Sequence, residues 1–205
     1  MQNSLLAIIS NAGRWREAER LGRRLRPMNE QIFGINDPET TEAILDFADS
    51  LAYQYRSVEA EVIFRDVLMR ASCLEGTEGR NTLRAMKGLS IVLRAPGQLD
   101  KGERLIREVL SIEKFRLGPH DPRVLGDMNL LATILHEQKK PDEATAMFLV
   151  VKRELANRTT EEYSSQVRTM AKNCSHGLGV IYSSCDQWHN AVEDFTVHGS
   201  IRQIL

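Results

Sequence analysis

Two cysteine–histidine pairs are the residues best suited to chemistry in this sequence, Cys174 with His176 and Cys185 with His189. Two cysteines and two histidines are enough ligands for a zinc ion, but these spacings are not those of a zinc finger or ribbon. A nucleophilic cysteine would need a cleft and a third group that orients the histidine, and nothing in the sequence marks either. We therefore predict no metal site and no cofactor.

Other catalytic patterns are equally unsupported. No glycine-rich phosphate loop follows a strand, because no segment of the sequence predicts a strand. Asp37, Asp121 and Asp142 stand where helices should begin, which is the place of a cap or turn residue rather than of an acid–base pair. The prediction is that the chain is not an enzyme.

The densest charge cluster consists of six arginines, namely Arg14, Arg16, Arg20, Arg23, Arg24 and Arg26. Such a helix could bind nucleic acid, anionic lipid or calmodulin. Glu17 and Glu19 interrupt the run, however, and Trp15 is the one aromatic residue near it that could stack on a base. We favour a solvated outer helix face, and we expect Trp15 and Trp188 to be core residues.

Composition limits the remaining classes. The chain has 205 residues, of which 42% are hydrophobic and 27% charged, with a net charge of −1, as in a folded soluble protein without a polyanion-binding field. Its apolar runs fall far short of the roughly 20 residues of a membrane helix, and Met1 to Ser10 lack the pattern of a secretory signal. Three cysteines cannot all pair within one chain. We predict a cytoplasmic protein that binds neither membrane nor nucleic acid.

A repeat of 42 residues organises the sequence. Ala18, Ala60, Gly102 and Ala144 are separated by this interval, as are Gly34, Gly76 and Gly118, and Pro38 and Pro122 lie two intervals apart. A fifth copy is displaced by five residues, which fit in a polar loop between Asn157 and Glu162. The repeat predicts a single array with units of about 1–35, 36–77, 78–119, 120–160 and 161–205.

Each unit predicts two amphipathic helices, about ten in all. Apolar pairs such as Ile63 and Val67 recur four residues apart in the second helix of each unit, which is helical spacing. A Gly–Pro breaker separates the units, because glycine ends a helix well and proline begins one. We expect Thr40 and Thr82 to cap the helices that follow. The fold class is all-α, a right-handed solenoid of antiparallel helix pairs.

The segments Leu117-Gly118-Pro119-His120-Asp121-Pro122 and Leu130-Leu131-Ala132, with Glu17-Ala18 in the second helix, resemble the tetratricopeptide repeat (TPR) of the kinesin-light-chain type. Leu178-Gly179, Tyr182 and Ala191 are similar to the ordinary tetratricopeptide signature. The resemblance covers nearly the whole chain. It departs at the third unit, where Arg80 replaces proline and Gly102 replaces alanine.

The resemblance implies that the first helix of each unit lines a concave groove that binds a peptide or protein. The residues expected to face this groove are Glu42, Leu45, Asp49, Tyr53, Arg84, Lys87, Arg94, Asn129, Thr133, His136, Asn173 and His176. Arg84, Lys87 and Arg94 would favour an acidic segment through charge-assisted hydrogen bonds. Asn129 could pair with a peptide backbone through its donor and its acceptor.

A second interpretation remains open. Similar arrays form the C-terminal sensor modules of larger nucleotide-binding NTPases, which act through oligomerisation or intramolecular contact. Leu5, Leu6 and Ile9 near one end, and Ile201, Ile204 and Leu205 near the other, have no polar capping helix. Solenoids need polar ends to stay soluble, so the uncovered apolar ends predict either a fragment of a longer array or a chain that covers its ends by self-association.

Overall fold

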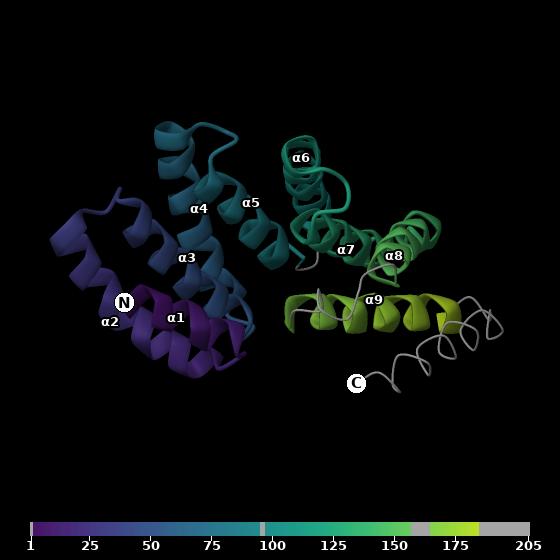
Figure 1. The fold of residues 1–205 in the computed structure, drawn as a ribbon, viewed down its shortest axis with the longest axis horizontal. Helices are drawn as coiled ribbons and strands as arrows, with labels where there is room; N and C mark the ends of the chain where they lie inside the picture. The colour runs from purple at the N-terminus through teal and green to yellow at the C-terminus, as the bar shows by residue number, and fades with distance from the viewer. Residues whose placement is uncertain (1, 95–96, 157–164, 185–205) are drawn as a thin grey trace. The chain divides into compact units, whose positions relative to one another are not determined.

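The computed structural model describes residues 2–94, 97–156 and 165–184, and every regular element within them is an α-helix, as the sequence predicts (Figure 1). The chain divides into two compact units, Met1–Val109 and Leu110–Leu205. The described helices are α1 (Gln2–Asn11), α2 (Trp15–Phe33), α3 (Pro38–Ala52), α4 (Ser57–Glu75), α5 (Arg80–Val92), α6 (Leu99–Leu117), α7 (Pro122–Glu137), α8 (Pro141–Ala156) and α9 (Ser165–Ser184). The tenth helix of the prediction falls outside the described residues.

The 42-residue interval of the sequence reappears in the helix boundaries. The second helix of successive pairs begins at Trp15, Ser57, Leu99 and Pro141. We call the first helix of each pair helix A and the second helix B. Few residues join A to B, so the two run antiparallel. The small residues Ala18, Ala60 and Ala144 of helix B are fully buried, because the two helices need a close approach there.

Aspartate, rather than threonine, caps α3 and α7, whereas Gly79 stands at the cap position of α5 without a side-chain hydrogen bond. The Asp37 side chain accepts hydrogen bonds from the backbone N–H groups of Glu39 and Thr40, and Asp121 accepts one from Arg123. The predicted caps Thr40 and Thr82 were wrong, because both threonines lie inside helices and are buried. At α3 and α7 a carboxylate directly before the helix-starting proline already satisfies the first free N–H groups, and at α5 the Glu75 side chain accepts from the backbone N–H of Asn81.

In the four repeats whose turn is described, the short turn between helices A and B contains a residue with a left-handed backbone. The positions are Gly13 (φ 72°), Tyr55 (φ 61°), Gly97 (φ 87°) and Lys139 (φ 61°), again 42 residues apart. Glycine adopts this conformation without steric cost, whereas a residue with a Cβ atom is strained by about 1–2 kcal/mol. Two of the four turns therefore hold strain.

We expect Tyr55→Gly to raise the free energy of unfolding by about 0.5–1 kcal/mol, because it removes strain at φ 61°. The Tyr55 side chain is 93% exposed, so little packing is lost with it. Urea denaturation would measure the gain, with Tyr55→Ala as the control that removes the ring but keeps a Cβ atom. A glycine variant no more stable than the alanine variant would contradict the strain.

The core of the first unit joins α3, α4 and α5. Its fully buried side chains include Ile44 and Leu51 of α3 and Phe64 and Val67 of α4, with Leu89 of α5 at 2% exposure. A smaller cluster, formed by Leu6, Ala18, Leu25 and Ala43, joins α1, α2 and α3. The helix A of the second pair, α3, therefore packs against the helix B of its own pair, α4, and against that of the pair before it, α2.

An aromatic ring faces a glycine at three of these helix contacts. A Cβ atom added to Gly88 on α5 would lie 2.2 Å from Cε1 of Phe64, and one added to Gly177 on α9 would lie 2.5 Å from Cζ of Phe148. Phe64 and Phe148 occupy the same position in their repeats. In the contact between α2 and α3 the arrangement is reversed, because the glycine, Gly22, is on helix B and the ring, Phe47, is on helix A.

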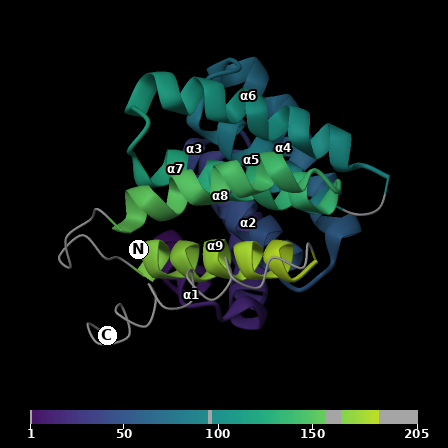
Figure 2. The same cartoon turned by 90° about the vertical axis from the view of Figure 1, so that its right-hand side faces the viewer.

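In the second unit α7, α8 and α9 lie side by side (Figure 2). Leu125, Leu131 and Ile134 of α7 are fully buried, as is Val151 of α8. Leu178 of α9 is 1% exposed. No helix in the described ranges is long and apolar enough to cross a lipid bilayer.

Candidate functional site

Opposite charges from α3 and α5 meet on the helix A faces of the first unit. Glu42, Asp46 and Asp49 follow one face of α3, and Arg80 and Arg84 follow one face of α5. Arg84 forms a salt bridge to Asp46 and a second one of 2.8 Å from its Nη2 atom to Oδ2 of Asp49. The Nη1 atom of Arg80 lies 3.0 Å from Oε1 of Glu42. Ion pairs therefore join this face of α3 to this face of α5.

Burial controls the electrostatics of this cluster. Burial raises the pKa of Asp49, and the attraction of Arg84 offsets only part of that effect. Burial alone would lower the pKa of Arg84, but Asp49 and Asp46 outweigh it and raise the pKa of the guanidinium further. The charge of Arg84 is thus balanced by two carboxylates of the same chain. Arg84 was expected to meet an acidic ligand, and its nearest anions are internal.

The other expected residues of the first unit differ in exposure. Lys87 and Arg94 are partly exposed on α5 and just after it, and Tyr53 is 53% exposed after α3. Burial and the nearby Asp49 charge raise the pKa of Tyr53. Leu45, which was expected to face the groove, is fully buried in the core. Leu45 belongs to the hydrophobic core cluster that α3, α4 and α5 form.

Trp15 and Tyr53 form an exposed aromatic stack. Their ring centroids are 4.1 Å apart and the ring planes are inclined by 10°. Trp15 is only partly buried, so the expectation that it is a core residue was wrong. The stack ties the start of α2 to the end of α3. Trp188 lies outside the described residues.

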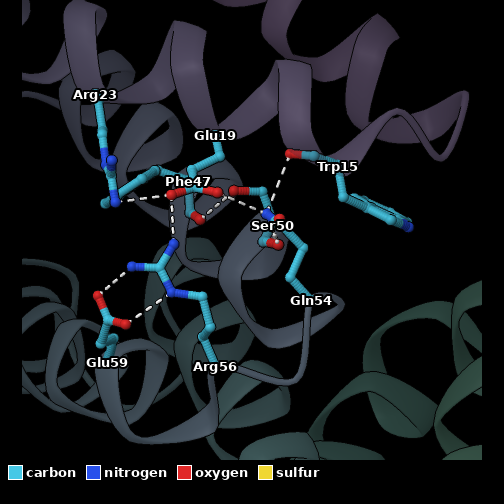
Figure 3. A network of polar contacts seen from close by, with 8 residues as sticks. All are labelled: Trp15, Glu19, Arg23, Phe47, Ser50, Gln54, Arg56 and Glu59. Atoms are coloured by element: carbon cyan, nitrogen blue, oxygen red, sulfur yellow. Dashed lines mark hydrogen bonds and ion pairs between the residues drawn. The ribbon is translucent and has the colours of Figure 1, made fainter.

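A polar network links α2 to the start of α4 (Figure 3). Glu19 pairs with Arg56 and with Arg23, whose Nη2 atom is 2.7 Å from Oε1 of Glu19, and it accepts a hydrogen bond of 2.9 Å from Gln54. Arg56 also pairs with Glu59. Burial raises the pKa of Glu19, but the bonds from Gln54 and Arg56 reverse this and lower it. These contacts were not predicted from the sequence, in which their signal is a set of unlike charges near the repeat junction.

In the second unit three expected residues share one face of α7, at intervals of four and three residues. Asn129 is 9% exposed, and its Oδ1 atom is buried with no hydrogen-bond partner among the described residues. Thr133 donates a bond of 2.9 Å to the Asn129 carbonyl, and His136 is partly exposed. Asn173 and His176 are exposed on α9. An amide oxygen without a partner is suited to accept a hydrogen bond from a bound group.

Cys174 lacks the properties of a nucleophile. The thiol is 1% exposed and donates a hydrogen bond of 3.1 Å to the Phe148 carbonyl. Burial raises its pKa to about 12, which leaves almost no thiolate at neutral pH. Cys185 and His189 lie outside the described residues. Within the described part of the chain, no three His, Cys, Asp or Glu residues are grouped as metal ligands would be.

The repeated antiparallel pairs and their small-residue crossings define a TPR-like repeat fold. Solved structures of the kinesin-light-chain type share it over 98% of this chain. The nearly identical TPR-like repeats of a putative kinesin light chain from Podosopora anserina match with a TM-score of 0.71 and 18% identity, covering 93% of that chain. A point variant of the same Podosopora anserina protein matches with a TM-score of 0.73, 18% identity and 92% coverage.

BtubC (BKLC) from P. vanneervenii matches with a TM-score of 0.76 and 17% identity, and 78% of that chain is covered. At such low identity the likeness shows a common fold. The resemblance that the sequence indicated is therefore confirmed at the level of the fold. No protein-family model and no curated protein matches the sequence.

Proposed function

We propose that this chain is a non-enzymatic scaffold that binds a peptide or protein segment along its helix A faces. The observation that carries the proposal is Asn129, whose buried Oδ1 atom has no hydrogen-bond partner in the described structure. Thr133 and His136 continue the same face toward solvent. If the Asn129 side chain rotates so that Oδ1 reaches the surface, an extended segment on this face would supply the missing N–H donor from its backbone.

In the first unit, the helix A face on α5 is charged. Lys87 and Arg94 supply the positive charge that favours an acidic segment, while Arg84 holds Asp46 and Asp49 in place. Reversing Arg84 would disturb the fold as well as the ligand, so Lys87 is the better probe. The proposed setting is the cytoplasm, with Cys73 and Cys174 as free thiols and with no role in nucleic-acid or membrane binding.

We expect Lys87→Glu to weaken binding of an acidic peptide several-fold to tens-fold, because a partly exposed charge contact contributes about 0.5–1.5 kcal/mol. Affinity should also fall as salt rises. A peptide library would supply the ligand. Titrating it with the parent chain and with the Lys87→Glu variant would measure the change in affinity. Asn129→Ala tests the α7 face of the second unit by itself, and it should weaken peptide binding there without altering the dependence on salt.

Lys101→Glu on α6 is the matched control, since Lys101 is exposed and carries the same charge. It should leave the affinity unchanged. Equal losses of affinity from Lys87→Glu and Lys101→Glu, or no loss from either, would contradict peptide binding along the helix A faces.

A second candidate function is assembly with further copies or repeats. On α1, Leu5 is 49% exposed and Ile8 is 63% exposed, an apolar surface for self-association. We expect sedimentation velocity to show association that increases with concentration and that Ile8→Lys reduces. A monomer over a wide range of concentrations would contradict this candidate and leave the peptide-binding proposal untouched. An NTPase sensor module would assemble in the same way, and proof of it would need a nucleotide-binding domain in the same gene product.

A further inference from the structure

The outer faces of α2 and α4 carry two parallel rows of side chains that differ in chemistry. On α2, Arg16, Arg20 and Arg24 follow each other at intervals of four residues, and all three are exposed. On α4, Val58, Val62 and Met69 lie along one helix face and are 78%, 66% and 63% exposed. We call these the arginine row and the aliphatic row.

The two rows face the same side of the first unit. Arg16 and Val58 are 42 residues apart, as are Arg20 and Val62, so they hold equivalent positions in neighbouring repeats. Arg56 at the start of α4 pairs with Glu19 of α2, and farther along α4 the Nη1 atom of Arg70 lies 2.8 Å from the Ile35 carbonyl that follows α2. These contacts place α2 and α4 side by side and in the same direction.

No carboxylate of the described structure neutralises the positive charge of the arginine row. Within the described structure its three guanidinium groups take part in no ion pair, whereas Arg14, Arg23 and Arg26 of the same helix pair with Glu17, Glu19 and Glu30. The charges nearest to the aliphatic row cancel, because Arg65 pairs with Glu61. One row therefore offers uncompensated positive charge and the other offers apolar surface.

We propose that the two rows dock an acidic amphipathic helix of a partner protein. Arginines four residues apart are about 6 Å apart along α2, which is also the spacing of carboxylates four residues apart on a helix lying alongside. The aliphatic row spans about 16 Å, so the bound helix has about three turns. Its acidic residues contact α2, and its aliphatic residues contact α4. This surface is separate from the helix A faces.

A helix suits the two rows better than a lipid surface does. Glu17 and Glu59 are exposed beside the rows and pair with Arg14 and Arg56, so the uncompensated positive charge is confined to a narrow strip bordered by glutamates. The aliphatic row also lacks the aromatic residues and the continuous apolar face with which helices usually enter a bilayer. A partner helix can place its own side chains to avoid the glutamates.

The test uses the full chain and a labelled synthetic helix of about 14 residues, with glutamates four residues apart and leucines on the adjacent face. A peptide with glutamine in place of glutamate is its control. Fluorescence anisotropy should show the glutamate peptide binding about tenfold tighter, with Arg20→Glu and Val62→Asp each weakening it about tenfold. Arg153→Glu should have no effect, because this exposed arginine lies on α8 in the second unit and belongs to neither row.

Equal binding of the two peptides, or equal losses from Arg20→Glu and Arg153→Glu, would overturn the proposal. A parallel arm replaces the peptide with phosphatidylcholine vesicles that contain about one third phosphatidylserine. Vesicle binding that Arg20→Glu abolishes, without binding of the peptide, would assign the rows to a membrane surface instead. The circular dichroism spectrum of each variant should match that of the parent chain, and Lys87→Glu should not change the affinity for the helix.

Discussion

Replacing Phe64 with alanine is expected to lower the free energy of unfolding by about 3–5 kcal/mol, since the ring is fully buried between α4 and α5. Gly88→Ala should also destabilise the protein, by about 1–3 kcal/mol. Alanine is the better helix former by about 1 kcal/mol, but its Cβ atom would lie 2.2 Å from the ring of Phe64. A buried ring in a closed core cannot move aside cheaply.

The two substitutions together should show a change of sign. In the Phe64→Ala protein the clash is gone, so Gly88→Ala should now stabilise, by up to about 1 kcal/mol. Urea denaturation of the parent, the two single variants and the double variant would measure the coupling. If Gly88→Ala has the same effect with and without Phe64, the ring does not fill the space above this glycine.

Arg84→Met is expected to cost about 2–3 kcal/mol at neutral pH. The substitution leaves Asp46 and Asp49 without the cation that balances them, and a largely buried pair costs more to break than a surface one. Arg80→Met is the control, because the Arg80 side chain is 84% exposed and its pair with Glu42 should contribute less than about 0.5 kcal/mol.

The loss from Arg84→Met should shrink as the pH falls. Burial raises the pKa of Asp49 in the folded protein above the ordinary value of 3.8, and removing Arg84 raises it further. The folded state then binds a proton more readily than the unfolded chain, so protonation stabilises the variant as the pH falls through the raised pKa. Denaturation at pH 7 and near pH 4.5 would show this, and Asp49→Asn in the same background should recover part of the loss at pH 7. Equal losses from Arg84→Met and Arg80→Met would contradict the buried pair.

Local patterns account for most of what the sequence predicted correctly. Ala18, Ala60 and Ala144 are fully buried because a period of 42 residues returns the same small residue to the same helix crossing. The helices themselves follow from apolar spacing and from the glycines and prolines that separate the repeats. Such signals depend on residues close to each other in the chain, so one sequence is enough to read them.

Contacts between neighbouring repeats were harder to predict. The partners of Arg84 lie 35 and 38 residues away, Asp49 and Asp46, so no repeat interval points to them. Charge alone made Arg84 an attractive ligand contact, and only the packing of α3 against α5 shows its internal partners. Leu45 and Trp15 were misplaced for a similar reason, since the width of a buried face depends on the adjacent helix.

The pairing of ring and glycine also restricts how this array could have grown by duplication. Gly22 accepts Phe47 from the following helix A, whereas Phe64 at the same repeat position needs Gly88. If the 42-residue segment from the start of α3 to the start of α5 were deleted, Gly22 of α2 would face α5. Because α5 carries no aromatic residue, a cavity would remain where the ring of Phe47 now packs. Copying that repeat would bring Phe64 against a second copy of Asp46, where a side chain occupies the space. The repeats are therefore no longer interchangeable. At each contact, the side-chain sizes fit only the helix that now lies there.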